Sequence, residues 1–396
     1  MQVIDGVRVW GEPDESTLAQ AKRCAAVGNV AATALMADAH KGYSMPIGGV
    51  IAYRNAVSPS GVGYDIACGI RADRTDIRVE DIRADLPLIA DEIASQVAFG
   101  LGSKNPTPLY HSLFDDPTWK DEPIIQPLFK RAREQLGSVG SGNHFVDLLE
   151  DEDGYLWVAA HFGSRGFGHG VASGFLNLAA GRDFYAKAPG ESMDQDPTVI
   201  PLDSELGQSY WACMHLAGRY AYAGRDYVVG QVLGILGAES EETVHNCHNF
   251  AQAEEHDGEK VVVVRKGATP AFPGQTGFVG GSMGDYAAIV AGIDSEENRL
   301  ALRSTVHGAG RIMSRSAAKG NRKGNRKGLI TRQMMSEWCH KFGVIVRGGD
   351  VDESPHVYRP LSGVLEAHSG SIEVLHRLRP VVVVMAGADV YDPYKD

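Results

Sequence analysis

Aspartate, cysteine and histidine gather in the glycine-rich parts of this 396-residue chain. Asp65 and Cys68 lie three residues apart in SPSGVGYDIACG, so a tight turn or one helical turn can direct both side chains at one site. A hard oxygen and a soft thiolate, completed by imidazoles, form a ligand set for a first-row transition metal. Alone, this pair is a weak signal, because a single cysteine beside glycines is more often a small buried residue.

Histidines elsewhere in the chain could complete such a site. His144 follows a run of small residues, His161 follows the apolar run YLWVAA, and His248 lies in a segment predicted to be helical, with His245 one turn earlier. Each alone is better explained as a hydrogen-bonded structural histidine. Their number favours a metal site, and two metals sharing Cys68 would suit phosphoryl transfer. The spacing does not separate manganese from zinc.

Three glycine clusters, GSRGFGHG, GGSMG and HGAGR, could present backbone N–H groups to an anion, with Arg165, Ser282 and Arg311 as further donors. No P-loop motif is present, and no strand, turn and helix unit of the Rossmann type surrounds these glycines. His307 begins the third cluster. A neutral imidazole is a good phosphoryl acceptor, so His307 is a candidate nucleophile, with a packing or ligand-supporting role as the alternative.

The elements that must position these residues alternate along the chain. The β-branched runs VIAY, YLWVAAHF, KVVVVRKG, FGVIVRGG and PVVVVMAG are bounded by Gly, Pro or charge, which indicates buried strands. Helical patterns lie between them at residues 16–28, 88–99, 209–236 and 330–343. These patterns predict a mixed α/β fold, although the strand order cannot be derived from the sequence.

Composition narrows the class of protein. The net charge of −12 argues against a protein that coats nucleic acid with basic residues, but a local basic lane is compatible with it. The loop KGNRKGNRKG at 319–328 is either a solvated turn between two helices or a phosphate contact. Five cysteines without a CxxC pair, no evident signal peptide and no long apolar run predict a soluble cytoplasmic protein.

Taken in order, the motifs resemble the RtcB family of RNA ligases. The resemblance runs from D-x-H-x-G-Y-x-x-P-I-G-G at 38–49 through GVGYDIACG, GSGNH, H-x-GSRG-x-GH, an HN block, RKGATPAFPG and GSMG to HGAGR-x-MSR. It implies one catalytic domain over 1–396, with mixed sheets around a deep polar cleft that holds metal. The basic loop 319–328 and a tail at 388–396 would be appended to this domain.

The resemblance also implies a mechanism. The family binds two Mn²⁺ ions, forms a histidine–GMP adduct from GTP, transfers GMP to an RNA 3′-phosphate and joins that end to a 5′-hydroxyl. A 2′,3′-cyclic phosphate is first opened by hydrolysis, and an archease-type activator is a possible partner. Matching positions are Asp65, Cys68, His144, His161 and His248 for metal, His307 for the adduct, Asn143, Ser282, Gly308 and Gly310 for guanylate, and Arg165 for phosphate.

Four positions depart from the family pattern. Ala386 stands where a lysine near the end of the family chain contacts guanine, and Asp147 stands where a glutamate follows GSGNHF. Lys41 and Ser44 interrupt the block that usually reads DVHWGYG. Three alternatives to sealing therefore stay open: a nucleotidyltransferase capping 3′-phosphate ends (DNA included), a metal-dependent cyclic phosphodiesterase, and a non-catalytic RNA-binding protein that holds metal for structure.

Overall fold

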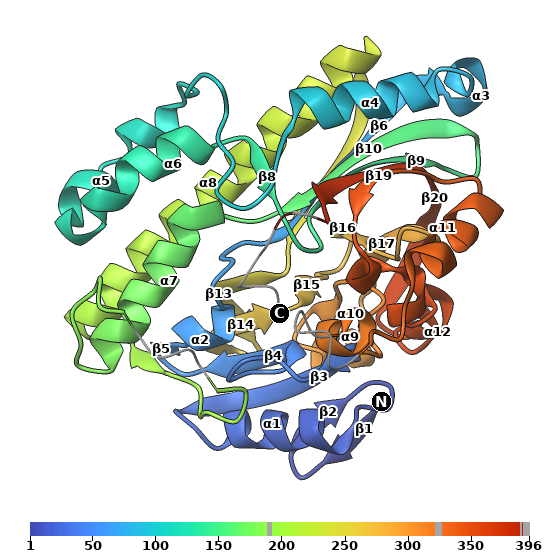
Figure 1. The fold of residues 1–396 in the computed structure, drawn as a ribbon. Helices are drawn as coiled ribbons and strands as arrows, with labels where there is room; N and C mark the ends of the chain where they lie inside the picture. The colour runs from blue at the N-terminus through green and yellow to red at the C-terminus, as the bar shows by residue number, and fades with distance from the viewer. Residues whose placement is uncertain (188–191, 321–326, 389, 391–396) are drawn as a thin grey trace.

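The computed structural model describes residues 1–187, 192–320, 327–388 and 390. It contains two large mixed sheets that bring together segments far apart in the sequence (Figure 1). The first sheet has six strands, in the order β1 (Gln2–Ile4), β2 (Val7–Val9), β3 (Val30–His40), β4 (Ile47–Tyr53), β14 (Glu259–Lys266) and β13 (Asn249–His256).

The second sheet contains His161 in one strand, and Cys68, His144 and His248 directly flank three of its strands. Its strands follow the order β12 (Ser240–Cys247), β6 (Gly69–Arg78), β10 (Tyr155–Phe162), β9 (Phe145–Glu150), β20 (Ile372–Gly387), β17 (Ala287–Gly292) and β16 (Thr276–Val279). β19 (Ile345–Gly349) pairs in parallel with the C-terminal half of β20. Three short pairs complete the strands: β5 (Ala56–Val57) with β11 (Ile200–Pro201), β7 (Ala98–Phe99) with β8 (Ser138–Gly140), and β15 (Ala268–Pro270) with β18 (Ser304–Val306).

Helices surround these sheets. The longer ones are α1 (Glu15–Ala25), α4 (Leu86–Gln96), α7 (Arg165–Ala179), α8 (Glu205–Leu236) and α11 (Arg332–Lys341). The shorter ones are α2 (Pro59–Val62), α3 (Val79–Ile82), α5 (Thr118–Asp121), α6 (Phe129–Gln135), α9 (Glu296–Leu300), α10 (Arg315–Lys319) and α12 (Leu361–Glu366). Four 3₁₀ turns lie at Ser112–Asp115, Pro123–Leu128, Val351–Glu353 and Pro355–Val357. The predicted mixed α/β fold is confirmed.

The alternation of β10 explains how the second sheet presents a histidine. Even-numbered residues such as Val158 and Ala160 face the core formed with α4 and α8, which lie along the outer side of the sheet (Figure 1). The odd-numbered Trp157 and Ala159 face the opposite way, towards β16 and β17. Because successive side chains of a strand point to opposite faces, His161 continues the second series and points away from the helices.

Helix α8 is the longest element, and its ends have clear local causes. The Ser204 hydroxyl accepts the Gly207 N–H at the N-terminus, and Gly237 ends the helix with a left-handed φ of 64°. Glycine at position 224 allows a close approach to the sheet, because a Cβ there would lie 3.1 Å from the Phe162 ring. The helix predicted over 209–236 is therefore confirmed, and it begins four residues earlier, at Glu205.

The helix predicted around His245 and His248 is wrong. His245 lies in β12 opposite Arg71 of β6, and His248 lies in the connection between β12 and β13. A His-x-x-His spacing fits one helical turn, but antiparallel pairing with β6 decides the local structure here. The sequence of a short polar segment gives no local signal that the segment pairs with a distant strand.

Two predicted appendages fall largely outside the described residues. Lys319 ends α10, and Gly320 pairs with Lys327 in an isolated bridge, while 321–326 are not described. Of the tail at 388–396, only residues 388 and 390 are described. Within the described ranges, no helix combines the length and apolarity needed to cross a membrane.

Candidate functional site

A cavity of about 730 Å³ is lined by residues of both large sheets and of the loops that follow their strands. Ten of the eleven residues singled out from the sequence line it, and Arg165 does not. Motifs spread over more than 240 positions of the chain therefore converge on one cavity. The ten are Asp65, Cys68, Asn143, His144, His161, His248, Ser282, His307, Gly308 and Gly310.

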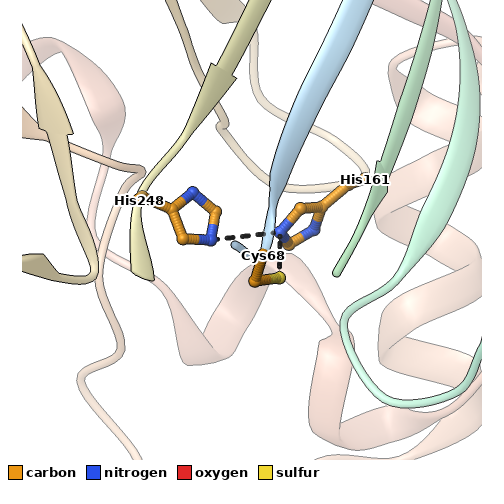
Figure 2. Close-up of side chains that lie close together, drawn as sticks. All are labelled: Cys68, His161 and His248. Carbon is orange, nitrogen blue, oxygen red and sulfur yellow. Dashed lines mark hydrogen bonds between the residues drawn. The ribbon is translucent and has the colours of Figure 1, made fainter. Parts of the chain in front are cut away.

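Two groups of metal-ligating atoms share the Cys68 thiol. One group is Cys68, His161 and His248 (Figure 2), and the other is Asp65, Cys68 and His144; within each group the donor atoms lie within 4.8 Å of one another. The Cys68 Sγ lies 3.3 Å from Nε2 of His161 and 3.6 Å from Nε2 of His144. This arrangement fits two cations with a bridging thiolate between them.

The Cys68 turn and the rings of His144 and His161 are each held by a hydrogen bond to a backbone carbonyl. The Cys68 N–H donates to the Asp65 carbonyl at 3.1 Å, which is the tight turn expected from their spacing. Nδ1 of His144 lies 2.9 Å from the Val139 carbonyl, and Nδ1 of His161 lies 3.0 Å from the Asn143 carbonyl. Hydrogen bonds through Nδ1 orient both rings and leave Nε2 directed at the shared site.

The electrostatics of the cluster suit cation binding. Burial lowers the pKa of His161 to about 3 and that of His248 well below its usual value, so both are neutral ligands at pH 7. Burial opposes ionisation of Asp65, but the hydrogen bond and charge of His144, together with the Arg165 charge and the Cys68 hydrogen bond, outweigh it and lower the pKa of Asp65 to about 2. Burial, reinforced by Asp65, raises the pKa of the Cys68 thiol well above its usual value. A bound cation would supply the positive charge that a buried thiolate requires.

His307 follows strand β18 and lies beside this cluster. Its ring centroid is 5.0 Å from that of His248, and its Nδ1 lies 2.7 Å from Oδ2 of Asp38. The same carboxylate oxygen accepts the backbone N–H groups of His307 at 3.0 Å and Gly308 at 3.2 Å. With Nδ1 turned to the carboxylate, Nε2 is the nitrogen available for attack on a ligand in the cavity.

Asp38 was not singled out from the sequence as a functional residue. It is fully buried in β3, and its carboxylate contacts His307 across 269 positions of the chain. Burial would raise its pKa, but the charge and hydrogen bonds of His307 prevail and lower it. The only sequence signal was its place at the start of the D-x-H block.

Two glycine-rich loops meet at the cavity wall. The Gly280 N–H donates to the His307 carbonyl at 3.2 Å, and Gly280 pairs with Gly308 in a parallel bridge. The Trp338 indole of α11 donates to the Gly284 carbonyl at 3.0 Å, which fastens the far end of the GGSMG loop. Ser282 is therefore held next to the HGAGR loop, where both can contact one anionic ligand.

Comparison with known proteins agrees with these motifs. The profile of the family described as tRNA-splicing ligase RtcB matches residues 20–121 and 116–386. The chain belongs to the RtcB family. The tRNA-splicing ligase RtcB of Thermococcus kodakarensis is 31% identical over 88% of this chain and 86% of its own length. The RNA-splicing ligase RtcB of Escherichia coli is 31% identical over 89% of each chain.

The positions that depart from the RtcB pattern have different places in the structure. Asp147 lines the cavity, and its Oδ1 has no hydrogen-bond partner among the described residues. Burial raises the pKa of Asp147 well above its usual value. Met385 lines the cavity as well, whereas the next residue, Ala386, is buried and does not. Lys41 lies at the cavity wall and its Nζ is 2.8 Å from Asp194.

Arg165 lies behind the cavity wall. Its guanidinium packs against Gly140, which has a left-handed φ of 91° and no side chain to obstruct it. The positive charge of Arg165 contributes to the lowered pKa of Asp65. In this RtcB-family structure, Arg165 therefore acts electrostatically on Asp65 from outside the cavity lining, and its phosphate-binding role stays a prediction.

Proposed function

We propose that this RtcB-family protein is an RNA ligase that joins a 3′-phosphate or 2′,3′-cyclic phosphate end to a 5′-hydroxyl end, using GTP and two Mn²⁺ ions. The observation that carries the proposal is His307 facing two donor groups that share Cys68. The relatives named as tRNA- or RNA-splicing ligases support the reaction class. The cytoplasmic location and an archease-type activator stay predictions.

The donor set fits divalent cations of the manganese or zinc kind. Asp65 and the neutral imidazoles provide oxygen and nitrogen ligands, while Cys68 adds a soft donor common to both groups. When bound, two such ions would neutralise the oxygens of the transferring phosphoryl group and hold them in place. Thiolate ligation is compatible with zinc, so the preference for manganese comes from the family resemblance.

His307 is the proposed nucleophile. Its Nε2 attacks the α-phosphorus of GTP, an N–P bond forms, and the bond to the β-phosphate oxygen breaks with release of pyrophosphate. Asp38 holds the Nδ1 proton throughout and stabilises the positive charge on the ring. The RNA 3′-phosphate then attacks the same phosphorus, freeing His307, and the 5′-hydroxyl finally displaces GMP. A cyclic phosphate would first be opened by water.

The nucleotide would lie along the two glycine-rich loops. Ser282 and the backbone of Gly308 and Gly310 line the wall beside His307, and Asn143 lies at the metal end. Asp147 offers an otherwise unpartnered buried carboxyl group to a ligand in the same cavity. Burial of an unsatisfied polar group costs about 1–3 kcal/mol, so a ligand that pairs with it would recover that free energy.

Mass spectrometry after incubation with GTP or ATP and Mn²⁺ tests the proposal directly. We expect a nucleotide adduct on a peptide containing His307, absent in His307→Ala and retained in the control His376→Ala. His376 is a suitable control because it pairs with Glu152 outside the cavity lining. Wild-type protein that never forms an adduct across a range of Mn²⁺ concentrations would rule the proposal out.

A second candidate function is suggested by Ala386, which stands where the family pattern has a lysine. The protein would cap 3′-phosphate ends, RNA or DNA, or open cyclic phosphates, without sealing. Product analysis with and without a 5′-hydroxyl partner strand separates the outcomes. A capped or opened strand that never joins its partner favours this candidate, whereas a longer product favours the ligase. Metal-dependent stability with no adduct would instead indicate a non-catalytic RNA-binding protein.

A further inference from the structure

Helix α8 directs one arginine into the protein directly behind the metal ligands. Arg225 is fully buried, although arginine is almost never fully buried without partners. Its Nη1 donates to the Ala67 carbonyl at 2.9 Å and to the Phe162 carbonyl at 2.6 Å, and its Nε donates to Nε2 of His245 at 2.9 Å. The guanidinium also lies 4.6 Å from the centroid of the Tyr222 ring.

These contacts reach all three chain segments that carry the Cys68, His161 and His248 group. Ala67 directly precedes Cys68, and Phe162 directly follows His161 in β10. His245 is three residues before His248, at the end of β12. The guanidinium of Arg225 is planar and its N–H donors have fixed directions. It therefore connects the residue before Cys68, the residue after His161 and the strand that leads to His248.

The Ala67 position needs such support. It is a non-glycine residue with a φ of 56°, a conformation that costs roughly 1–2 kcal/mol for an L-residue. Its N–H donates to the Asn249 carbonyl at 2.7 Å, and the Cys68 carbonyl accepts the His248 N–H at 2.8 Å. The hydrogen bond from Arg225 fixes the Ala67 carbonyl as well, in the turn from which the Cys68 thiol faces both ligand groups.

We propose that Arg225 is a positioning residue for the metal centre: it holds the Cys68 turn and the end of β10 at the spacing required for a shared thiolate ligand. The assignment rests on the metal site of the proposed function. Arg225 lines no part of the cavity and acts only through the ligands. Partners that orient metal ligands typically change metal affinity by about 10–100-fold when they are removed.

The experiment compares wild-type protein with Arg225→Met, Arg225→Lys and a control, Arg219→Met. Arg219 lies on the same helix, half-exposed, and pairs with Asp116 at 2.6 Å, far from the ligand contacts. Co²⁺ titration reports affinity, and its thiolate charge-transfer absorption reports Cys68 ligation. Thermal unfolding with and without Co²⁺ gives the increase in Tm that metal binding produces.

A positioning role predicts at least tenfold weaker Co²⁺ binding and an altered charge-transfer band in Arg225→Met, with the increase in Tm on metal binding reduced. Arg225→Lys should be intermediate, and Arg219→Met should match the wild type. A purely structural role would lower the Tm of the metal-free protein but leave the band, the affinity and the increase unchanged. That result would overturn the assignment.

Two further outcomes are decisive. If Arg225→Met does not fold, Arg225→Lys carries the comparison, and wild-type affinity and absorption in that variant would overturn the assignment. If both variants fail to fold while Arg219→Met folds, Arg225 is structural and the assignment is overturned. Wild-type protein that shows no thiolate-to-Co²⁺ absorption at all would instead refute the metal site itself, and with it both proposals.

Discussion

At the scale of single residues, the chemistry proposed for His307 depends on Asp38. One buried carboxylate oxygen faces Nδ1 of the histidine and accepts two backbone N–H groups of the same loop. It thereby fixes both the ring orientation and the nitrogen that carries the proton. In the proposed reaction, a carboxylate in this position would also stabilise the cationic imidazole formed when Nε2 bonds to phosphorus.

We predict that Asp38→Asn slows nucleotide-adduct formation about 10²- to 10⁴-fold, because the neutral amide no longer holds the Nδ1 proton against the ring. Rapid-quench measurement of the adduct with GTP and Mn²⁺ gives the rate. Asp194→Asn is the matched control, since Asp194 is exposed and pairs with Lys41 at the cavity edge. An Asp38→Asn rate within threefold of wild type would contradict this role.

At the scale of elements, strands with continuous β-branched runs were predictable and polar strands were not. The apolar runs of β4, β10, β14 and the C-terminal half of β20 are almost continuously buried, because both faces of these strands are covered. β19 is only partly buried and, among the described strands, pairs with β20 alone. β12 contains Glu, His and Asn, and only its pairing with β6 makes it a strand. The candidate metal ligands were recognisable by residue type, whereas Asp38 and Arg225 make non-local contacts that local patterns do not reveal.

The turn after β3 offers a test of stored strain. Ser44 has a φ of 58° where the family pattern has glycine, and the Met45 N–H donates to the Tyr43 carbonyl across it at 2.6 Å. The Ser44 hydroxyl is buried without a hydrogen-bond partner in the described residues. Ser44→Gly removes the buried hydroxyl and roughly 1–2 kcal/mol of backbone strain. It also gives the unfolded chain more conformational entropy, which lowers stability by about 0.5–1 kcal/mol.

Ser44→Gly should therefore stabilise the protein by about 1 kcal/mol, measured as a rise of about 1 °C in Tm for a chain of this length. Asn55→Gly is the comparison, because Asn55 also has a positive φ of 49° but is exposed, and asparagine tolerates this conformation. Its Tm should change less. A lower Tm for Ser44→Gly than for wild type would show that the turn is not strained by serine.

At the scale of the whole molecule, buried neutral histidines link stability to pH. Burial lowers the pKa of His40 and His368 to about 4, of His161 to about 3 and of His245 to about 2. In the unfolded chain each has a pKa of about 6.5, so between pH 6.5 and 4 the unfolded state binds more protons. The free energy of unfolding therefore falls as pH falls through this window. The lowered pKa values of Asp38 and Asp65 add losses only at more acidic pH.

From pH 7.5 to 5.5, each such histidine should lower the free energy of unfolding of the metal-free protein by about 1 kcal/mol. Urea unfolding in the presence of a chelator measures the difference between the two pH values. His368 isolates one contribution, because it is fully buried and stacks on Trp10. Its Nε2 accepts a hydrogen bond from the Ala37 N–H at 3.2 Å. His368→Gln should reduce the loss between the two pH values by about 1 kcal/mol, whatever its stability at pH 7.5. A loss equal to that of the wild type would mean that His368 titrates alike in the folded and unfolded states.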